Sequence, residues 1–227
     1  MQRPRIVIVG ASLAGATVAA TLREDGFDGD IRLIGAEPQL PYSRPPLSKA
    51  YLRGEEGFEA QLVKPAAYYT EQRIELMLGT RVTALDAKQK IVTLEGREPV
   101  AYDRLVVATG GRNRPVSVPG GQLPGIFQLR TVEDCDRIRA AVGRGRRVVV
   151  MGFGFIGSEV SASLRQLGVE VTAIEGGRVP LARVVGEEVG QVLASIHREK
   201  GVSLIAEDSV AAFEGDPPVG RVRTAKR

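Results

Sequence analysis

Two turns rich in small residues carry the positions best suited to bind a phosphate group. In the first turn these positions are Gly10, Ser12, Ala14 and Gly15, and in the second they are Gly152, Gly154 and Gly157. Small residues let a pyrophosphate approach the backbone, and the positive end of a following helix offsets its charge. Ser12 departs from the glycine fingerprint, but its small hydroxyl keeps the turn tight and is itself able to bond to a phosphate.

An acidic residue follows each turn at the spacing of roughly 20 residues that the dinucleotide fingerprint requires. These residues are Glu37 and Glu175. A carboxylate at this position accepts hydrogen bonds from ribose hydroxyls. In the first unit Ala36 precedes Glu37, and spacing alone does not decide which of the two lies beside the ribose.

Each turn is embedded in the same order of predicted elements. Strand, helix and strand are expected at residues 6–9, 14–24 and 31–34, and again at residues 147–151, 156–167 and 169–174. The strands are apolar and rich in β-branched residues, which is typical of parallel strands buried on both faces. One such match is weak evidence, whereas its repetition favours two bound dinucleotides. The sequence therefore predicts an α/β fold with two Rossmann-like dinucleotide-binding units.

A proline-rich segment at residues 41–49 presents two cations, Arg44 and Lys49. Its three prolines disfavour a regular helix or a central strand, so we expect a rigid loop. Fixed cations there would neutralise a phosphate or lie beside an electron-rich ring. From composition alone, a surface connection with solvated charges is an equally good interpretation.

Composition excludes several classes of function. The chain has 227 residues and a net charge of +4, without a Lys/Arg cluster interleaved with aromatic residues, so nucleic acid is not expected as a partner. No apolar run is long enough to cross a membrane, and the N-terminus enters a strand directly, so neither a membrane span nor a signal peptide is expected. A single cysteine, Cys135, precludes an internal disulfide and favours the reducing cytoplasm. We expect Cys135 to be a small buried residue, and His197 to lie on the surface of a helix without a catalytic role.

Five motifs together resemble the oxygenase-coupled NADH–ferredoxin reductases, which are FAD flavoproteins with two dinucleotide-binding domains. In chain order the motifs are GASLAG, IRLIGAEPQLPYSRPPLSKAYL, YDRLVVATGGRNRP, FQLRTVEDC and VVVMGFGFIGSEV. The likeness runs from residue 5 to about residue 205. The PPLSK and ATGGR motifs give it its specificity, because the glycine fingerprints alone are shared with related families. The resemblance implies FAD and NADH as cofactors, with no metal site.

The resemblance also implies roles for individual residues around FAD. The first turn would hold the FAD pyrophosphate, with Glu37 or Ala36 beside the adenosine ribose. The other positions implied to contact FAD are Arg44, Lys49, Val82, Ala108, Thr109, Gly110 and Arg130. Of these, Arg44 and Lys49 would approach the flavin, and Val82 would present its backbone to the adenine.

For NADH, the second turn would hold the pyrophosphate, and Glu175 would favour NADH because it would repel the 2′-phosphate of NADPH. Lys49 and Glu159 are expected to pair near the flavin, as the catalytic residues. A cation there stabilises the negative charge that arrives with a hydride. The cofactors themselves carry the hydride chemistry.

By this resemblance the FAD-binding domain comprises residues 1–113, and an incomplete NADH-binding domain comprises residues 114–227. Members of the family continue well beyond this length, so the sequence is expected to be a fragment, a truncated product or a minimal form. The expected function is electron transfer from NADH through FAD to an acidic iron–sulfur ferredoxin that serves an oxygenase. The alternatives are a nucleotide-binding remnant without turnover, or a flavoprotein reductase of the rubredoxin or nitrite-reductase type. The sequence does not predict an oligomeric state.

Overall fold

The chain forms two compact units, which are described separately. The computed structural model describes residues 3–143 and 146–226. Unit 1 contains the described residues up to Arg44 together with Phe58–Arg112, and unit 2 contains Pro45–Gly57 together with the described residues from Asn113 onward. Within the described ranges, no helix is both long and apolar enough to cross a membrane.

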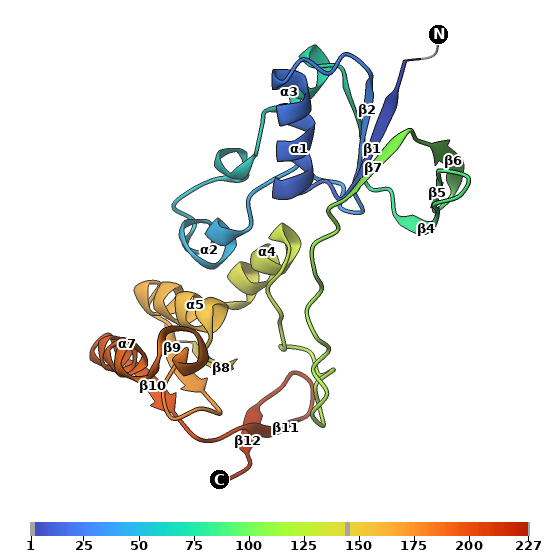
Figure 1. Cartoon of the computed structure of the whole chain (residues 1–227). Helices are drawn as coiled ribbons and strands as arrows, with labels where there is room; N and C mark the ends of the chain where they lie inside the picture. The colour runs from blue at the N-terminus through green and yellow to red at the C-terminus, as the bar shows by residue number, and fades with distance from the viewer. Residues whose placement is uncertain (1–2, 144–145, 227) are drawn as a thin grey trace. The chain divides into compact units, whose positions relative to one another are not determined.

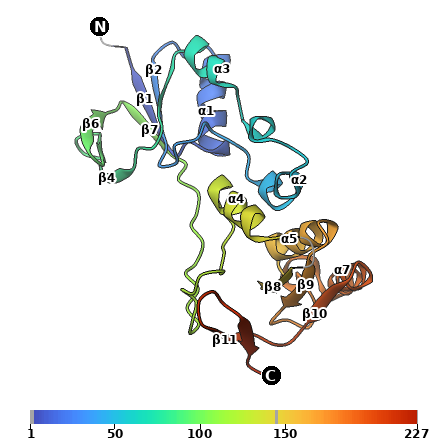
Figure 2. The same ribbon diagram turned by 180° about the vertical axis from the view of Figure 1, so that it is seen from behind.

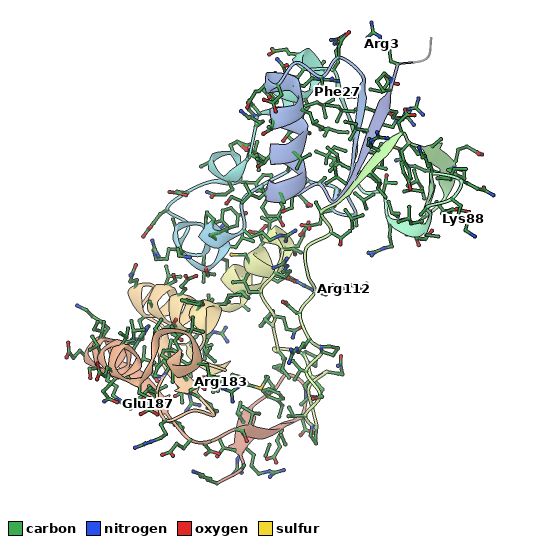
Figure 3. All side chains as sticks on the ribbon, viewed as in Figure 1. Arg3, Phe27, Lys88, Arg112, Arg183 and Glu187 are labelled. Carbon is green, nitrogen blue, oxygen red and sulfur yellow. The ribbon has the colours of Figure 1, made fainter. Side chains whose placement is uncertain are left out.

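Unit 1 is built on a parallel sheet of four strands in the order β3-β2-β1-β7. The strands are β1 (Arg5–Val9), β2 (Asp30–Ile34), β3 (Ile74–Met77) and β7 (Arg104–Val107). On one face, α1 (Leu13–Glu24) and α3 (Ala66–Glu71) enclose a cluster that includes Ile8, Ala16 and Tyr69. Phe27, which follows α1, packs against this cluster (Figure 3). Because successive side chains of a strand point to opposite faces, Ile8 lies in this cluster while Val7 and Val9 lie on the other face.

The other face of this sheet is covered by a smaller antiparallel sheet. Its strands are β4 (Val82–Asp86), β5 (Ile91–Leu94) and β6 (Arg97–Ala101). Val7 and Val9 of β1 pack against Val92, Leu94 and Val100. Figures 1 and 2 show the helices and the antiparallel sheet on opposite sides of the parallel sheet. Because both faces of β1 are covered, a continuous apolar run rather than an alternating one is needed there.

Unit 2 contains a parallel sheet in the order β10-β9-β8 and a separate hairpin. The strands are β8 (Arg147–Met151), β9 (Glu170–Ile174) and β10 (Val202–Ile205), and the hairpin joins β11 (Val210–Glu214) to β12 (Arg221–Thr224). The helices are α4 (Val132–Ala141), α5 (Phe155–Gln166), α6 (Ala182–Val185) and α7 (Glu187–Glu199). A capping box begins α4: the Thr131 side chain accepts from the Asp134 N–H, and the Asp134 carboxylate accepts from the Thr131 N–H.

The segment Pro45–Gly57 packs with α4 and α5 of unit 2. It holds the 3₁₀ turn η1 (Pro45–Ser48) and the short helix α2 (Ala50–Arg53), and η2 (Phe58–Gln61) follows in unit 1. The Tyr51 hydroxyl donates to the Asp136 carboxylate (2.9 Å), and the Cys135 thiol donates to the Leu47 carbonyl (3.1 Å). The segment expected to be a rigid loop thus contains one 3₁₀ turn, η1, and no regular helix or central strand between residues 41 and 49. Prolines are tolerated there because the first residues of a helix have no use for an N–H donor.

The predicted elements agree with the structure to within one or two residues. The helix expected at residues 14–24 begins one residue earlier, and the helix expected at 156–167 is α5, Phe155–Gln166. The strands expected around both turns are all present. The division into domains at residues 113 and 114 stays a prediction, and the compact units differ from it chiefly in the assignment of Pro45–Gly57.

Candidate nucleotide-binding sites

The first turn requires glycine for reasons of space as well as backbone conformation. Gly10 has φ +116°, and a Cβ atom there would lie 2.1 Å from the Ala108 carbonyl oxygen. A Cβ atom on Gly15 would lie 1.9 Å from the Gly10 carbonyl oxygen. Ser12 is the N-cap of α1 without capping it through its side chain, since its hydroxyl donates to the Tyr42 carbonyl (3.4 Å). The first-turn N–H groups of α1 therefore suit an anion.

The acid that follows β2 is already engaged by two side chains. Glu37 accepts a hydrogen bond from the Tyr42 hydroxyl (2.5 Å) and forms an ion pair with Arg44. The Arg44 guanidinium also lies over the Tyr42 ring, 5.2 Å from its centroid. Arg44, expected to approach a flavin, thus lies beside the predicted ribose position, where it compensates the charge of Glu37. Ala36 is exposed.

The ATGGR motif lies at the same edge of the sheet as the first turn. The Ala108 N–H donates to the Val9 carbonyl (2.7 Å), and the Ala108 carbonyl closely approaches Gly10. Thr109 and Gly110 follow, both exposed, and Gly110 has φ +65°. The turn after β1 and the turn after β7 therefore share one edge, as expected for residues around one ligand.

Two of the predicted FAD contacts lie in other elements. Val82 begins β4 and pairs with Leu94 in the antiparallel sheet. Arg130 belongs to unit 2, where its N–H donates to the Asp134 carboxylate (2.9 Å) just before α4. Their roles toward a nucleotide stay predictions.

The second turn forms an open cradle at the start of α5. Gly152 has φ +87°, and a Cβ atom on Gly157 would lie 2.1 Å from the Gly152 carbonyl oxygen. By contrast, a Cβ atom on Gly154, the N-cap of α5, would meet no protein atom within 4 Å. The close packing of Gly157 brings the helix against the turn, and the open space at Gly154 leaves room for a phosphate group.

Glu175 joins this turn to the loop after β9. Its carboxylate accepts hydrogen bonds from the backbone N–H groups of Phe153 and Gly177, both at 2.8 Å. Phe153 is fully buried, and its ring packs edge-on against His197 of α7 with 4.7 Å between centroids. His197 is therefore a partly buried packing residue rather than the surface residue expected from sequence, and burial lowers its pKa.

Lys49 and Glu159 come together within unit 2, as expected. The Lys49 ammonium lies 2.6 Å from Glu159 Oε2 and 3.1 Å from the Pro45 carbonyl oxygen. The Ser48 hydroxyl donates to the same Glu159 oxygen at 2.5 Å. Burial raises the pKa of Glu159, but the hydrogen bonds from Lys49 and Ser48 outweigh it, so the pKa is lowered overall. Glu159 is therefore an ionised partner for Lys49.

Cys135 is fully buried, as expected, and burial raises the pKa of its thiol to about 11. A thiol in that state is a poor nucleophile. Within the described residues, no group of three or more His, Cys, Asp or Glu side chains is arranged to hold a metal ion.

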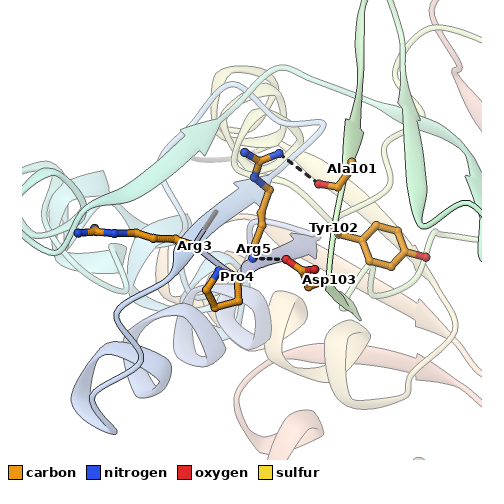
Figure 4. A pocket seen from close by; sticks show the side chains of 6 residues that line it. All are labelled: Arg3, Pro4, Arg5, Ala101, Tyr102 and Asp103. Atoms are coloured by element: carbon orange, nitrogen blue, oxygen red, sulfur yellow. Dashed lines mark hydrogen bonds between the residues drawn. The ribbon is translucent and has the colours of Figure 1, made fainter. Parts of the chain in front are cut away.

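A hollow of about 260 Å³ lies at the opposite end of β1 from the first turn (Figure 4). Its lining residues are Arg3, Pro4, Arg5, Ala101, Tyr102 and Asp103. The Arg5 N–H donates to the Asp103 carboxylate (2.6 Å), and the Arg5 guanidinium donates to the Ala101 carbonyl (3.4 Å). Because it lies at the start of the strand, this hollow is no part of the nucleotide sites.

Comparison with known proteins identifies the family. The family described as "Pyridine nucleotide-disulphide oxidoreductase" matches residues 4–226. The chain belongs to this family. The two cradles and the Rossmann-like sheets agree with its fold.

Within the family, the chain is similar to ferredoxin reductases of oxygenase systems. It is 44% identical over 218 residues to a probable ferredoxin reductase, CtmF, of Castellaniella defragrans, covering 96% of this chain and 53% of that protein. It is 39% identical to the benzene 1,2-dioxygenase system ferredoxin–NAD(+) reductase subunit of Pseudomonas putida, covering 96% and 53%. A solved structure, the covalent putidaredoxin reductase–putidaredoxin complex, superposes with a TM-score of 0.95 at 37% identity, covering 100% of this chain and 56% of that one. The chain thus spans about half the length of the curated relatives it matches.

Proposed function

We propose that the chain binds FAD and NADH and passes electrons from NADH through FAD to an acidic iron–sulfur ferredoxin that serves an oxygenase. The observation that carries the proposal is the pair of glycine cradles in one chain, each at the start of a helix. Relatives named as ferredoxin reductases of dioxygenase systems support the identity of the electron donor and acceptor. The net charge of +4 is consistent with an acidic partner. We place the protein in the cytoplasm because its one cysteine is a free, buried thiol.

In unit 1 the cradle fits the pyrophosphate of FAD. Gly10 and Gly15 would let the pyrophosphate approach the backbone, and the small side chains of Ser12 and Ala14 would not block it. The N-terminus of α1 would offset the negative charge of the phosphates. The ribose would lie beside Glu37 or Ala36. The remaining proposed FAD contacts are Arg44, Lys49, Val82, Ala108, Thr109, Gly110 and Arg130.

In unit 2 the cradle fits the pyrophosphate of NADH. The space at Gly154 admits the phosphates, while Gly152 and Gly157 hold the turn against α5. Each Glu175 oxygen accepts one backbone hydrogen bond and keeps further acceptor capacity, so the carboxylate is able to receive ribose hydroxyls as well. The same charge would repel the 2′-phosphate of NADPH, which gives the preference for NADH.

Bound FAD supplies the capacity to accept a hydride and to release single electrons. The chain contributes binding, orientation and charge. With FAD bound, Lys49 would supply a positive charge that favours hydride arrival at the flavin, and Glu159 would hold the ammonium in place. No side chain has to donate or accept a proton during the hydride step. We assign the FAD-binding role to residues 1–113 and the NADH-binding role to residues 114–227.

Ferredoxin reduction tests the proposal. The chain is loaded with FAD, supplied with NADH without oxygen, and mixed with an acidic [2Fe–2S] ferredoxin, while a rubredoxin is used in a parallel sample. We expect the ferredoxin spectrum to bleach, faster at low salt than at high salt because opposite charges steer the encounter. Faster reduction of rubredoxin would favour a rubredoxin reductase, and bound nucleotides without any electron transfer would make the chain a binding module.

A further inference from the structure

Ser48 is a buried polar residue at the end of η1, to which the sequence pattern gave no role. Ser48 is 5% exposed, and its hydrogen bonds link two segments that are more than a hundred positions apart in the sequence. The Ser48 hydroxyl reaches Glu159 Oε2 of α5 at 2.5 Å, and the Ser48 carbonyl accepts a hydrogen bond from the Ser163 hydroxyl one turn further along α5 at 2.7 Å. The serine is therefore held to α5 by both its side chain and its backbone.

The hydroxyl has one proton and two acceptors within reach. The Pro45 carbonyl lies 3.2 Å from Ser48 Oγ, whereas Glu159 Oε2 lies at 2.5 Å and carries negative charge. Hydrogen bonds to an ionised acceptor are shorter and roughly twice as strong as neutral ones, so the proton belongs to the bond with Glu159. The Pro45 carbonyl then accepts its hydrogen bond from the Lys49 ammonium, which lies 3.1 Å away.

The ion pair by itself has little to hold it in one geometry. The Lys49 side chain is 45% exposed and that of Glu159 is 31% exposed. Partly exposed ion pairs of this kind contribute little to stability, and their long side chains sample many rotamers. The hydrogen bond from Ser48 to Glu159 is better fixed than the ion pair, because Ser48 is buried and its backbone carbonyl accepts from Ser163. The Ser163 hydroxyl in turn accepts from the Arg53 guanidinium at 3.2 Å.

We propose that Ser48 is a positioning residue for the Lys49–Glu159 pair: its hydroxyl fixes the carboxylate oxygen to which the Lys49 ammonium binds. The role in electron transfer rests on the function proposed above. The positioning itself is a property of unit 2 alone. Two donors, the Ser48 hydroxyl and the Lys49 ammonium, bind the same oxygen of the ionised Glu159 carboxylate. The two donors come from consecutive residues of the chain.

The test is an NMR titration of the Glu159 side-chain carboxyl in the full chain without nucleotide, with the resonance assigned from its absence in Glu159→Gln. Replacing Ser48 by Ala removes the donor while leaving the backbone carbonyl for Ser163. The lost hydrogen bond stabilised the ionised form, so we expect the pKa of Glu159 to rise toward that of a free glutamate. Ser161→Ala is the matched control, because it also removes a buried hydroxyl, one that lies on α5 and donates to the Gly157 carbonyl instead of to Glu159.

An unchanged Glu159 titration in folded Ser48→Ala would overturn the proposal, as would an equal rise in Ser161→Ala. If Ser48→Ala does not fold, Ser48→Cys serves in its place, since a thiol of similar shape is a weaker donor and should also raise the pKa. A second measurement addresses the electron-transfer role: with FAD bound, Ser48→Ala should slow flavin reduction by NADH several-fold. Because the titration needs no cofactor, failure of FAD to bind would count against the proposed function and leave the positioning result standing.

Discussion

The carboxylate of Glu175 accepts a hydrogen bond from the backbone N–H of Phe153, across 22 residues of sequence and at 2.8 Å. This bond ties the end of β9 to the turn that follows β8. The other carboxylate oxygen binds the Gly177 N–H at the same distance. The acid expected only to recognise a ribose therefore also shapes the cradle in which the phosphates would lie.

Replacing Glu175 by Ala should consequently lower the stability of the chain as well as change its choice between NADH and NADPH. Two backbone donors lose their acceptor, at a cost of about 1–3 kcal/mol for each one left buried. We expect lower stability in urea unfolding together with weaker binding of both NADH and NADPH. Glu175→Gln keeps one carbonyl acceptor and removes the charge, so it should retain more stability and narrow the preference for NADH. Equal stability of Glu175→Ala and wild type would show that the hydrogen bonds to Phe153 and Gly177 do not hold the turn. Tighter binding of NADPH than of NADH by the wild-type chain would refute the proposed preference for NADH.

Two glycines of the second turn should respond to alanine in opposite ways. In Gly157→Ala the new methyl group would collide with the Gly152 carbonyl, so the variant should be destabilised by roughly 1–3 kcal/mol, as for other overpacked sites. In Gly154→Ala the methyl group meets no protein atom and φ is −76°, so stability should be unchanged while NADH binding weakens at least tenfold.

Thermal unfolding and NADH titration of both variants measure these effects. Gly220→Ala provides a control, because a Cβ atom there also meets nothing within 4 Å and the residue lies outside the cradle. Wild-type affinity for NADH in Gly154→Ala would mean that the phosphates bind elsewhere.

Lys49→Met should separate electron transfer from folding. The ion pair with Glu159 is partly exposed and so contributes little to stability, but the positive charge is proposed to lie beside a ring that becomes negative. We expect the rate of flavin reduction by NADH to fall roughly tenfold or more, with the unfolding midpoint nearly unchanged. Lys64→Met is a suitable control, since Lys64 belongs to another partly exposed ion pair, with Glu24. Identical reduction rates for the two variants would remove Lys49 from the catalytic machinery.

The Cys135 thiol should be protected from alkylation in the folded chain. Its pKa is raised to about 11, first by burial, whereas an unfolded thiol titrates near 9. The folded chain therefore keeps the proton at pH values where the unfolded chain loses it. The contribution of this group to stability is fully present below pH 9 and declines as the pH rises toward 11. Iodoacetamide labelling at pH 8 followed by mass spectrometry should give slow modification that accelerates in urea, and rapid labelling of the native chain would contradict the burial of this residue.

Much of the fold was predictable because its signals are local. Apolar runs that end in glycine predict strands such as β1 and β8. Acidic residues in the first turn predict the start of α4. The fingerprint spacing also indicated Glu37 and Glu175, whose role toward a ribose stays a prediction. The pairing of Lys49 with Glu159 was expected only from a resemblance. The distance of 2.6 Å confirms the contact, whereas its place beside a flavin stays a prediction.

The parts that sequence reasoning missed all depend on contacts between distant segments. Nothing local indicates that the Arg44 guanidinium pairs with Glu37 over the Tyr42 ring, or that His197 packs against Phe153. The role of Ser48 was hidden for the same reason, since its partner lies 111 residues away. In the sequence, the position of Ser48 directly before Lys49 in the PPLSK motif is the one feature that marks it.

We propose that this chain alone holds FAD and NADH so that electrons pass from one to the other. The experiment is to add FAD to the purified chain, remove free FAD by gel filtration, and record the absorbance spectrum before and after adding NADH without oxygen. We predict a flavin band that elutes with the protein and bleaches on addition of NADH, with Lys49→Met bleaching more slowly. A flavin band found only in the late, protein-free fractions, or a bound flavin that NADH leaves oxidised, would contradict the claim.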